Sequence, residues 1–275
     1  MDQEALIGQG RTAGVYAWGE GRILKLYQEW MPASAVEREY IVTCAAHDAG
    51  LPVPAAYELI EMEGRHGIIF ERIVGTSLLA SLQKKPWTLV AVARRLGELH
   101  AQIHANPAPA DLPGQRQQIE EGILAGRDLP EAGRTAALAH LRQLPEGQAL
   151  CHGDFHPDNI LLSARGPVII DWLTGTRGDP LADVARTSLL FETAGLPPGT
   201  PAIAGLVINL SRSLLHSIYL GRYLQLHPAR RGQIDCWRLP LLAARLREVE
   251  NYPREKQVVL SNLIAMVKGQ SKRRA

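Results

Sequence analysis

Residues 151–159 have the sequence CHGDFHPDN, and residues 169–172, slightly further along the chain, have the sequence IIDW. The first stretch contains the pattern H-x-D-x-x-x-x-N, which includes Asp154 and Asn159, and the second places Asp171 after an apolar run. In phosphoryl-transfer enzymes this spacing supplies a carboxylate beside the attacking hydroxyl, an asparagine on magnesium, and an aspartate on magnesium that bridges the phosphates. The alternative is a polar loop before a hairpin, with its histidines satisfied by hydrogen bonds.

The stretch between these motifs predicts a β-hairpin, because residues 160–162 and 168–170 are apolar runs separated by a turn. Asn159 and Asp171 each lie six residues from Arg165. Antiparallel pairing centred on Arg165 therefore brings both side chains to the open end of the hairpin. Amide and carboxylate oxygens are the hard ligands that Mg²⁺ prefers. The sequence thus predicts Asn159 and Asp171 as magnesium ligands.

The N-terminal part of the chain carries a second motif of nucleotide sites. The pattern G-x-G-x-x-G-x-V is approximated from Gly8 onward, with Gly10 as the second glycine and Ala13 in the third glycine position. A glycine-containing hairpin turn is the alternative interpretation. The loop precedes a predicted strand that carries Lys25, which is placed to reach nucleotide phosphates. Taken alone, Lys25 also fits a solvated strand charge.

A helix is predicted from Ser34, because Ser34 lies three residues before Glu37 as in a capping box, and Gly50 suits a C-terminal cap. In that arrangement Glu37 bonds the backbone N–H of Ser34, whereas Glu39 has no local partner. We therefore expect Glu39, rather than Glu37, to pair with Lys25. The alternative is that both glutamates are surface charges.

The fold class predicted is α+β, with residues 1–74 as a small β-rich N-lobe and residues 75–275 as a larger, mostly helical C-lobe. Short apolar runs between glycine-rich turns predict the strands of the first part, and apolar residues recur at helical spacing in the second. The helical patterns cover residues 89–103, 118–127, 135–144, 180–193, 203–226 and 234–249. The basic end, residues 268–275, is typical of a solvated tail.

The composition of the chain limits which classes of binding partner we expect. A hydrophobic content of 46% is that of an ordinary globular chain, and a net charge of +2 gives no strong field for nucleic acid. The longest apolar run, residues 202–208, is far shorter than the roughly 18 residues of a spanning helix. Residues 1–4 lack the basic and apolar regions of a signal peptide, and the 3 cysteines show no disulfide or zinc spacing. We therefore expect a cytoplasmic protein that binds neither nucleic acid nor a membrane.

Together, the motifs from Gly8 to about Leu190 resemble the aminoglycoside phosphotransferase and choline kinase-like family, which shares the protein-kinase fold. The motifs that carry this resemblance are residues 152–159, 170–172 and 178–180, together with Asp183. The resemblance implies a bilobal enzyme with ATP between its lobes. It further implies transfer of the γ-phosphoryl group to a hydroxyl of a small molecule.

The resemblance also implies roles for individual residues of the nucleotide site. Asp154 is implied as the catalytic base, and Asn159 and Asp171 as ligands of Mg²⁺. Lys25 and Glu39 are implied as an ion pair near the phosphates. These assignments agree with those made from the spacing of the motifs.

Outside the phosphate site, the resemblance implies a hinge over residues 68–75, where the Glu71 carbonyl and the Ile73 N–H meet the adenine. It also implies that Asp183 supports the catalytic loop from within the protein. Ala13 departs from the family's loop glycine, which weakens the assignment of Gly8 and Gly10 to the phosphates relative to that of the magnesium site.

Two other functions share this fold. A protein kinase needs a longer segment than the seven residues between Asp171 and Asp179 to dock a peptide, and no A-P-E motif follows. A nucleotide-binding regulatory protein without turnover is the other alternative, but it has no reason to keep base, lysine and both metal ligands together. His100 and His104 have the i, i+4 spacing of zinc ligands but lack the glutamate of H-E-x-x-H, so we expect them to be structural. No sequence pattern identifies the acceptor or the oligomeric state.

Overall fold

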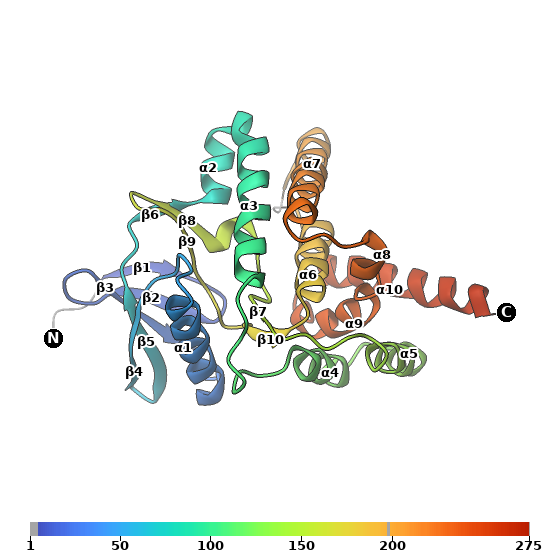
Figure 1. Ribbon diagram of the computed structural model, residues 1–275, viewed down its shortest axis with the longest axis horizontal. Coiled ribbons are helices and arrows are strands. Elements are labelled where there is room, and N and C mark those ends of the chain that lie inside the picture. Colours follow the sequence, from blue (N-terminus) through green and yellow to red (C-terminus); the bar gives the residue numbers. More distant parts are fainter. Residues whose placement is uncertain (1–4, 197–198, 275) are drawn as a thin grey trace.

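The computed structural model describes residues 5–196 and 199–274, so the N-terminal residues 1–4 lie outside the described part. An antiparallel sheet and one helix form the N-terminal part, and a larger, mostly helical part follows (Figure 1). The sheet has the strand order β1-β2-β3-β5-β4. Its strands are β1 (Leu6–Gln9), β2 (Ala13–Ala17), β3 (Arg22–Tyr27), β4 (Ala56–Met62) and β5 (Arg65–Glu71). The predicted α+β class, with a small β-rich lobe before a larger helical one, is confirmed.

Helix α1 (Ala33–Asp48) follows β3 and buries Val36 against the sheet. Its first turn differs from the sequence prediction, because Pro32 occupies the N-cap position and no side chain caps the helix. A capping box between Ser34 and Glu37 was therefore the wrong prediction. Proline suits this position since its ring fixes φ and it has no N–H that would need a partner.

The helical lobe contains most of the apolar core. Its helices are α2 (Leu78–Lys84), α3 (Leu89–His104), α4 (Gln115–Ala125), α5 (Glu131–Leu141), α6 (Pro180–Thr193), α7 (Ala202–Leu226), α8 (Arg231–Asp235), α9 (Arg238–Glu248) and α10 (Pro253–Arg274). The single helix predicted over residues 234–249 is divided between α8 and α9. The basic end of the chain, predicted as a solvated tail, is helical as far as Arg274 as part of α10, and Figure 1 shows this helix reaching outward from the lobe.

Two small sheets of the second lobe carry the motifs. Strands β6 (Gly75–Ser77), β8 (Ile160–Ser163) and β9 (Gly166–Ile169) form one sheet. Strands β7 (Ala149–Cys151) and β10 (Thr176–Gly178) form the other. The first contains the predicted hairpin, and the second brings the ends of the two motif segments together.

The register of the hairpin differs by one residue from the predicted register. Ile160 pairs with Ile169, and the Ile170 N–H donates a hydrogen bond of 3.0 Å to the Asn159 carbonyl. Asn159 therefore lies opposite Ile170 rather than Asp171, because the turn leaves two residues, not one, at its centre. Asp171 has a φ of 65°, a left-handed conformation that is rare for a residue other than glycine. This turn of the backbone after the strand redirects the Asp171 side chain.

Helices α3 and α7 lie side by side in the helical lobe (Figure 1). Gly97 lies at their closest approach, where an added Cβ would come within 2.8 Å of the Tyr219 carbonyl oxygen and 2.9 Å of the Tyr223 nitrogen. Glu98 and Arg222 form an ion pair of 2.9 Å between the same two helices. The close approach therefore depends on the absence of a side chain at Gly97.

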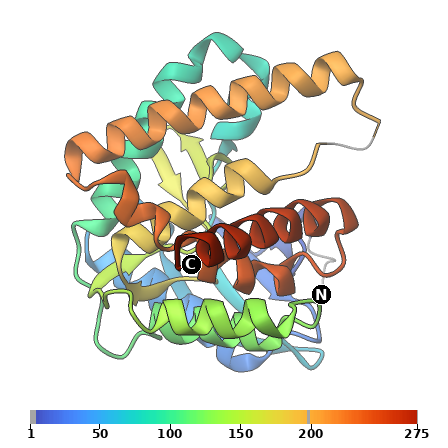
Figure 2. The ribbon, with the colours of Figure 1, turned by 90° about the vertical axis from the view of Figure 1, so that its right-hand side faces the viewer.

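Helix α7 extends along one edge of the lobe, where it is drawn in orange (Figure 2). Its second half contributes Leu215 and Leu220 to the core, while its first half exposes Ile203 and Leu210. By length and composition alone α7 is apolar enough to cross a membrane, with a mean hydropathy of 1.3 over a window that is 22% buried. The sequence pattern predicted a helix over residues 203–226, but unbroken apolar runs alone did not indicate that it is apolar enough to span a membrane. The absence of a membrane partner remains a prediction.

The contact between α3 and α7 leads to a paired test of stability. Gly97→Ala should lower the free energy of unfolding by about 1–3 kcal/mol, because backbone atoms of α7 must move away from the new methyl group. Gly221→Ala in α7 meets no atom within 4 Å. It should instead raise stability by up to about 1 kcal/mol through helix propensity. Urea unfolding of both variants measures the difference, and equal effects would contradict the close approach.

Candidate active site

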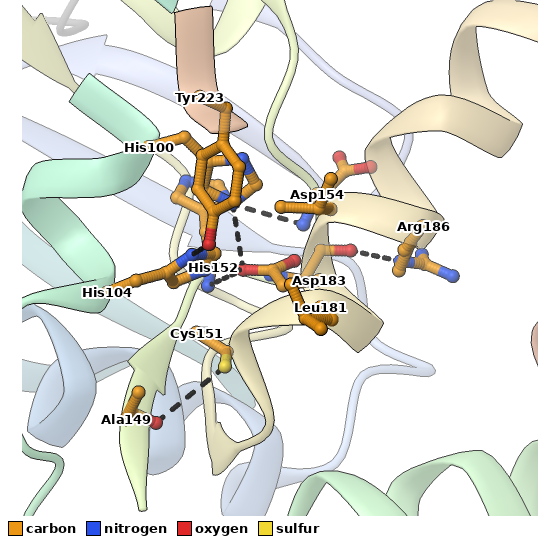
Figure 3. Close-up of polar contacts among 12 residues, drawn as sticks. His100, His104, Ala149, Cys151, His152, Asp154, Leu181, Asp183, Arg186 and Tyr223 are labelled. Carbon is orange, nitrogen blue, oxygen red and sulfur yellow. Dashed lines mark hydrogen bonds and ion pairs between the residues drawn. The ribbon is translucent and has the colours of Figure 1, made fainter. Parts of the chain in front are cut away.

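The predicted catalytic loop follows β7 and is held from behind by one buried carboxylate. Asp183 of α6 accepts a hydrogen bond of 2.6 Å from the His152 N–H and one of 3.0 Å from the Gly153 N–H (Figure 3). Gly153 has a φ of 78°, and a Cβ there would lie 2.4 Å from the Thr174 carbonyl oxygen. Only glycine satisfies both conditions. The loop backbone is therefore fixed immediately before Asp154.

The Asp154 side chain is 31% exposed and lies among hydrogen-bond donors and cations. The Asn159 amide nitrogen donates to the backbone carbonyl oxygen of Asp154 at 2.9 Å and to the Asp154 carboxylate at 3.3 Å. The His156 Nε2 lies 3.4 Å from the same carboxylate oxygen. Burial alone would raise the pKa of Asp154, but the hydrogen bond and charge of His156, together with the charge of Arg186, outweigh it and hold the pKa well below its usual range. Asp154 is therefore ionised at neutral pH.

The donor atoms of Asn159 and Asp171 fit a hard divalent cation. Asn159 is buried and uses its amide nitrogen on Asp154, so its amide oxygen is the atom that remains to meet a cation. Asp171, which is 39% exposed, offers a carboxylate oxygen. His152 fixes the strand end between them, because its Nε2 lies 3.1 Å from the Ile170 carbonyl oxygen. Two oxygen ligands, of which that of Asp171 is exposed to solvent, suit Mg²⁺, which keeps several of its waters.

Lys25 joins the sheet, α1 and the segment after β9. Its Nζ donates to Glu39 at 2.7 Å and to Asp171 at 2.8 Å. Burial lowers the pKa of Lys25, but the charges of Asp171 and Glu39 outweigh burial and raise it well above its usual value. Lys25 is thus a fixed cation. Of the two glutamates considered from the sequence, the buried Glu39 contacts Lys25, whereas Glu37 is exposed.

The two glycines of the predicted phosphate loop lie in and beside the turn between β1 and β2. The Gly10 N–H donates to the Ala13 carbonyl at 2.8 Å, which closes the turn. A Cβ on Gly8 would come no closer than 3.7 Å to Val15. This segment therefore forms a hairpin turn. A role for Gly8 and Gly10 in binding phosphates remains a prediction.

The predicted hinge residues Glu71 and Ile73 lie at the end of β5 and directly after it. Glu71 ends β5, and its carboxylate accepts hydrogen bonds of 2.8 and 2.9 Å from the two terminal nitrogens of Arg165, in the turn between β8 and β9. It also accepts the Ala55 N–H at 3.2 Å. Ile73 lies in the link between β5 and β6. The role of the Glu71 and Ile73 backbone in adenine binding remains a prediction, whereas the tie between Glu71 and Arg165 was not anticipated.

Sequence reasoning assigned no role to three residues that surround the site. Tyr27 donates a hydrogen bond from its hydroxyl to the second oxygen of Glu39. The sequence could have indicated this role of Tyr27, because residues two apart in a strand point to the same face, so Tyr27 lies on the same face of β3 as Lys25. His156 lies within the quoted motif. Arg186 donates to the Gly153 carbonyl, and it lies one helical turn after Asp183, so its inward direction follows from the helical period.

A comparison with protein families agrees with this geometry. A model of the phosphotransferase enzyme family, abbreviated APH, matches residues 5–206. The chain belongs to this family. The match covers both lobes as far as the start of α7 and includes every predicted site residue. The resemblance drawn from the motifs and the prediction of a small-molecule kinase are therefore confirmed.

Curated relatives in this family are longer proteins. Acyl-CoA dehydrogenase family member 10 of Mus musculus is 28% identical over 198 residues, which cover 63% of this chain and 18% of the relative. Acyl-CoA dehydrogenase family member 11 of Homo sapiens is 27% identical over 188 residues, which cover 58% of this chain and 23% of the relative. The chain thus spans about a fifth of the length of these relatives.

Solved structures show the same fold at low sequence identity. An apo thermostable mutant of aminoglycoside phosphotransferase APH(4)-Ia has a TM-score of 0.68 and 18% identity, covering 97% of this chain and 94% of that chain. A putative fructosamine-3-kinase from Haemophilus somnus has a TM-score of 0.63 and 14% identity, covering 97% of this chain and 90% of that chain. The predicted protein-kinase-like fold is therefore confirmed over nearly the whole chain.

The contrast between the two glutamates of α1 is testable without any ligand. Glu39→Ala should lower the free energy of unfolding by about 1–3 kcal/mol, because it leaves the buried Tyr27 hydroxyl without its acceptor. Glu37→Ala, at an exposed position of the same helix, should change stability by less than about 0.5 kcal/mol. Urea unfolding compares the variants, and a larger loss for Glu37→Ala would show that the capping interaction exists in solution.

Proposed function

We propose that the protein uses ATP and Mg²⁺ to transfer the γ-phosphoryl group to a hydroxyl of a small molecule. The observation that carries this proposal is the meeting of three functional groups from distant parts of the chain. Lys25 is bonded to Glu39 and to Asp171, while Asn159 is bonded to Asp154. A cation for phosphates, oxygen ligands for a metal and an ionised base are the parts that phosphoryl transfer requires.

In this proposal Asp154 orients the acceptor. Its low pKa keeps the carboxylate ionised, so it accepts a hydrogen bond from the attacking hydroxyl. A carboxylate of low pKa is a weak base, so the proton moves to it only as the oxygen forms its bond to phosphorus. His156 and Arg186 sustain this state by their positive charge. Asp154 therefore contributes chiefly by orienting the attacking hydroxyl, and it accepts the proton late in the reaction.

The nucleotide and metal assignments rest on residues that fit both groups. Mg²⁺, when bound, neutralises charge on the phosphate oxygens. The Asn159 amide oxygen and the Asp171 carboxylate are the atoms proposed to hold it. One APH(4)-Ia structure is described as a ternary complex with ADP and hygromycin B, and another contains AMP-PNP and hygromycin B. These relatives support a nucleotide site in this chain.

The rest of the proposed nucleotide site comes from the N-lobe. Lys25 is proposed to bind phosphate oxygens, and the turn containing Gly8 and Gly10 to cover them. The backbone at Glu71 and Ile73 is proposed to meet the adenine. These positions lie in or directly after the N-terminal sheet, while the base and metal ligands lie on loops of the second lobe.

A small-molecule acceptor fits the structure better than a protein acceptor. After Asp171 the chain passes through residues 172–175 and β10, and α6 begins at Pro180. Residues 176–178 of this link pair with β7 and Asp179 caps α6, so only residues 172–175 remain, which is too short a segment for a peptide to dock on. The acceptor therefore has to reach Asp154 directly from solution.

The first functional prediction concerns the base. Asp154→Asn should lower turnover by about 10²–10⁴-fold, because the amide cannot accept the proton, while the affinity for Mg·ATP stays nearly unchanged. Asp158→Asn is a matched control in the same loop, since Asp158 is exposed and bonds Ser77 at 2.6 Å. ADP release is measured with a panel of hydroxylated metabolites, amino alcohols and antibiotics. Near-normal turnover in Asp154→Asn would refute the assignment, and a wild-type protein that binds Mg·ATP without turnover would favour the regulatory alternative.

A second prediction concerns the metal. Asp171→Ala should weaken Mg·ATP binding more than Asn159→Ala, because it removes a charge as well as a ligand. Calorimetric titration at fixed Mg²⁺ compares the two with Asp158→Ala as control. Binding that is unchanged in both variants would mean that the hairpin is only structural.

A further inference from the structure

Behind the catalytic loop lies a buried cluster to which the proposed reaction assigns no role. His100 and His104 of α3 point their Nε2 atoms at one oxygen of Asp183, at 3.2 and 3.3 Å (Figure 3). Their Nδ1 atoms meet the hydroxyls of Tyr219 and Tyr223 of α7, at 2.7 and 2.8 Å. Both pairs have i, i+4 spacing, so two equivalent Tyr–His arrangements end on one carboxylate.

The direction of each hydrogen bond follows from the charge of Asp183. Burial opposes ionisation of Asp183, but hydrogen bonds from His100 and His104 outweigh it and hold the pKa well below its usual range. An ionised carboxylate only accepts, so both Nε2 atoms carry protons. Burial lowers the pKa of His100 to about 3, so this ring is neutral and its Nδ1 accepts from the Tyr219 hydroxyl. The arrangement at His104 matches it, with Nδ1 2.8 Å from the Tyr223 hydroxyl, so we expect the same direction there.

The cluster contacts the catalytic loop in two ways. The Asp183 oxygen that receives both histidines also accepts the His152 N–H, and its other oxygen accepts the Gly153 N–H. In addition, the His100 ring stacks on Phe155, with centroids 4.2 Å apart and planes at 22°. Phe155 follows Asp154 directly, so the loop is held on both sides of the proposed base.

We propose that Tyr219 with His100, and Tyr223 with His104, are positioning residues that hold the catalytic loop through Asp183. Each tyrosine orients its histidine, and each histidine orients the carboxylate that receives the loop N–H groups. Helix α7 is thereby connected by hydrogen bonds to the backbone of His152 and Gly153, directly before Asp154. That these residues affect catalysis rests on the proposed function. That they hold the loop in one conformation does not depend on that function.

A bound cation is the competing explanation, because His100, His104 and Asp183 offer ligand atoms within 4.8 Å of one another. The two explanations require opposite protonation of the rings. A cation takes the Nε2 lone pairs and leaves the proton on Nδ1, which then donates to the tyrosine. Hydrogen bonding leaves the proton on Nε2. The Asp183 oxygen already accepts the His152 N–H at 2.6 Å, which favours hydrogen bonding.

The first measurement is hydrogen exchange of the 275-residue chain without ligands. Tyr219→Phe, Tyr223→Phe and the double variant remove hydroxyls and keep the rings. The double variant should speed exchange of the His152 and Gly153 amides by about tenfold or more, because Asp183 loses its fixed orientation. Glu98→Gln is the matched control, since it removes an ion pair between the same helices without touching the cluster. Unchanged exchange in the double variant, or equal acceleration in the control, would overturn the proposal.

A second measurement determines the proton positions. Nitrogen NMR of the ¹⁵N-histidine-labelled protein should show His100 and His104 as neutral rings protonated on Nε2. Protonation on Nδ1 together with about one equivalent of bound metal would overturn the proposal in favour of a cation site.

Kinetics then connect the cluster to catalysis. With an acceptor from the panel, His100→Leu should lower kcat by about tenfold or more with little change in the KM for ATP, because the base is misplaced and the nucleotide site is intact. His100→Gln keeps an N–H group directed at Asp183 and should recover most of this loss. Equal kcat in His100→Leu and wild type overturns the proposal. Absence of turnover in the wild type instead refutes the proposed function, while the exchange measurement still tests the order of the loop.

Discussion

The arrangement of the site depends on one buried negative charge. Asp183 has no exposed side-chain surface, and an isolated carboxylate in such a place would be strongly unfavourable. It is compensated by two histidines and two backbone N–H groups, which approach from α3 and from the catalytic loop. Because each donor is needed, the positions of α3, α6 and the loop are mutually determined. The residues proposed as base and metal ligands lie in this loop or follow it in the chain, so their positions depend on the same arrangement.

The sequence was most informative where chemistry requires fixed spacing. The H-x-D-x-x-x-x-N pattern and the later aspartate predicted the loop, the hairpin and the family. Helix α6 was predicted with its observed bounds, since Pro180 and its neighbours combine a capping aspartate with a helical apolar period. The pairing of Lys25 with Glu39 was predicted correctly for an incorrect reason, because the capping box that excluded Glu37 does not form. The true reason is burial, since the helix turns Glu39 toward the sheet and Glu37 toward solvent.

The features that were missed depend on contacts between distant segments. The predicted register of the hairpin was wrong by one residue. Counting outward from Arg165 assumes a single central residue in the turn, whereas the turn has two central residues. Asp171 also has a left-handed backbone, a conformation that the sequence pattern around it did not predict. His100 and His104 were expected to be structural, and the structure shows that they contact Tyr219 and Tyr223, more than 100 residues later, which the sequence did not indicate. Periodicity identifies a buried face without identifying what it contacts.

The bond between Glu71 and Arg165 also limits how the lobes can move. It joins the end of the N-terminal sheet to the turn of the hairpin in the second lobe through two parallel hydrogen bonds. Paired contacts of this kind resist both stretching and twisting. A movement of the two lobes that kept this pair intact would have to be a rotation about it. In such a rotation, residues far from the pair, such as those of the β1–β2 turn, would travel furthest.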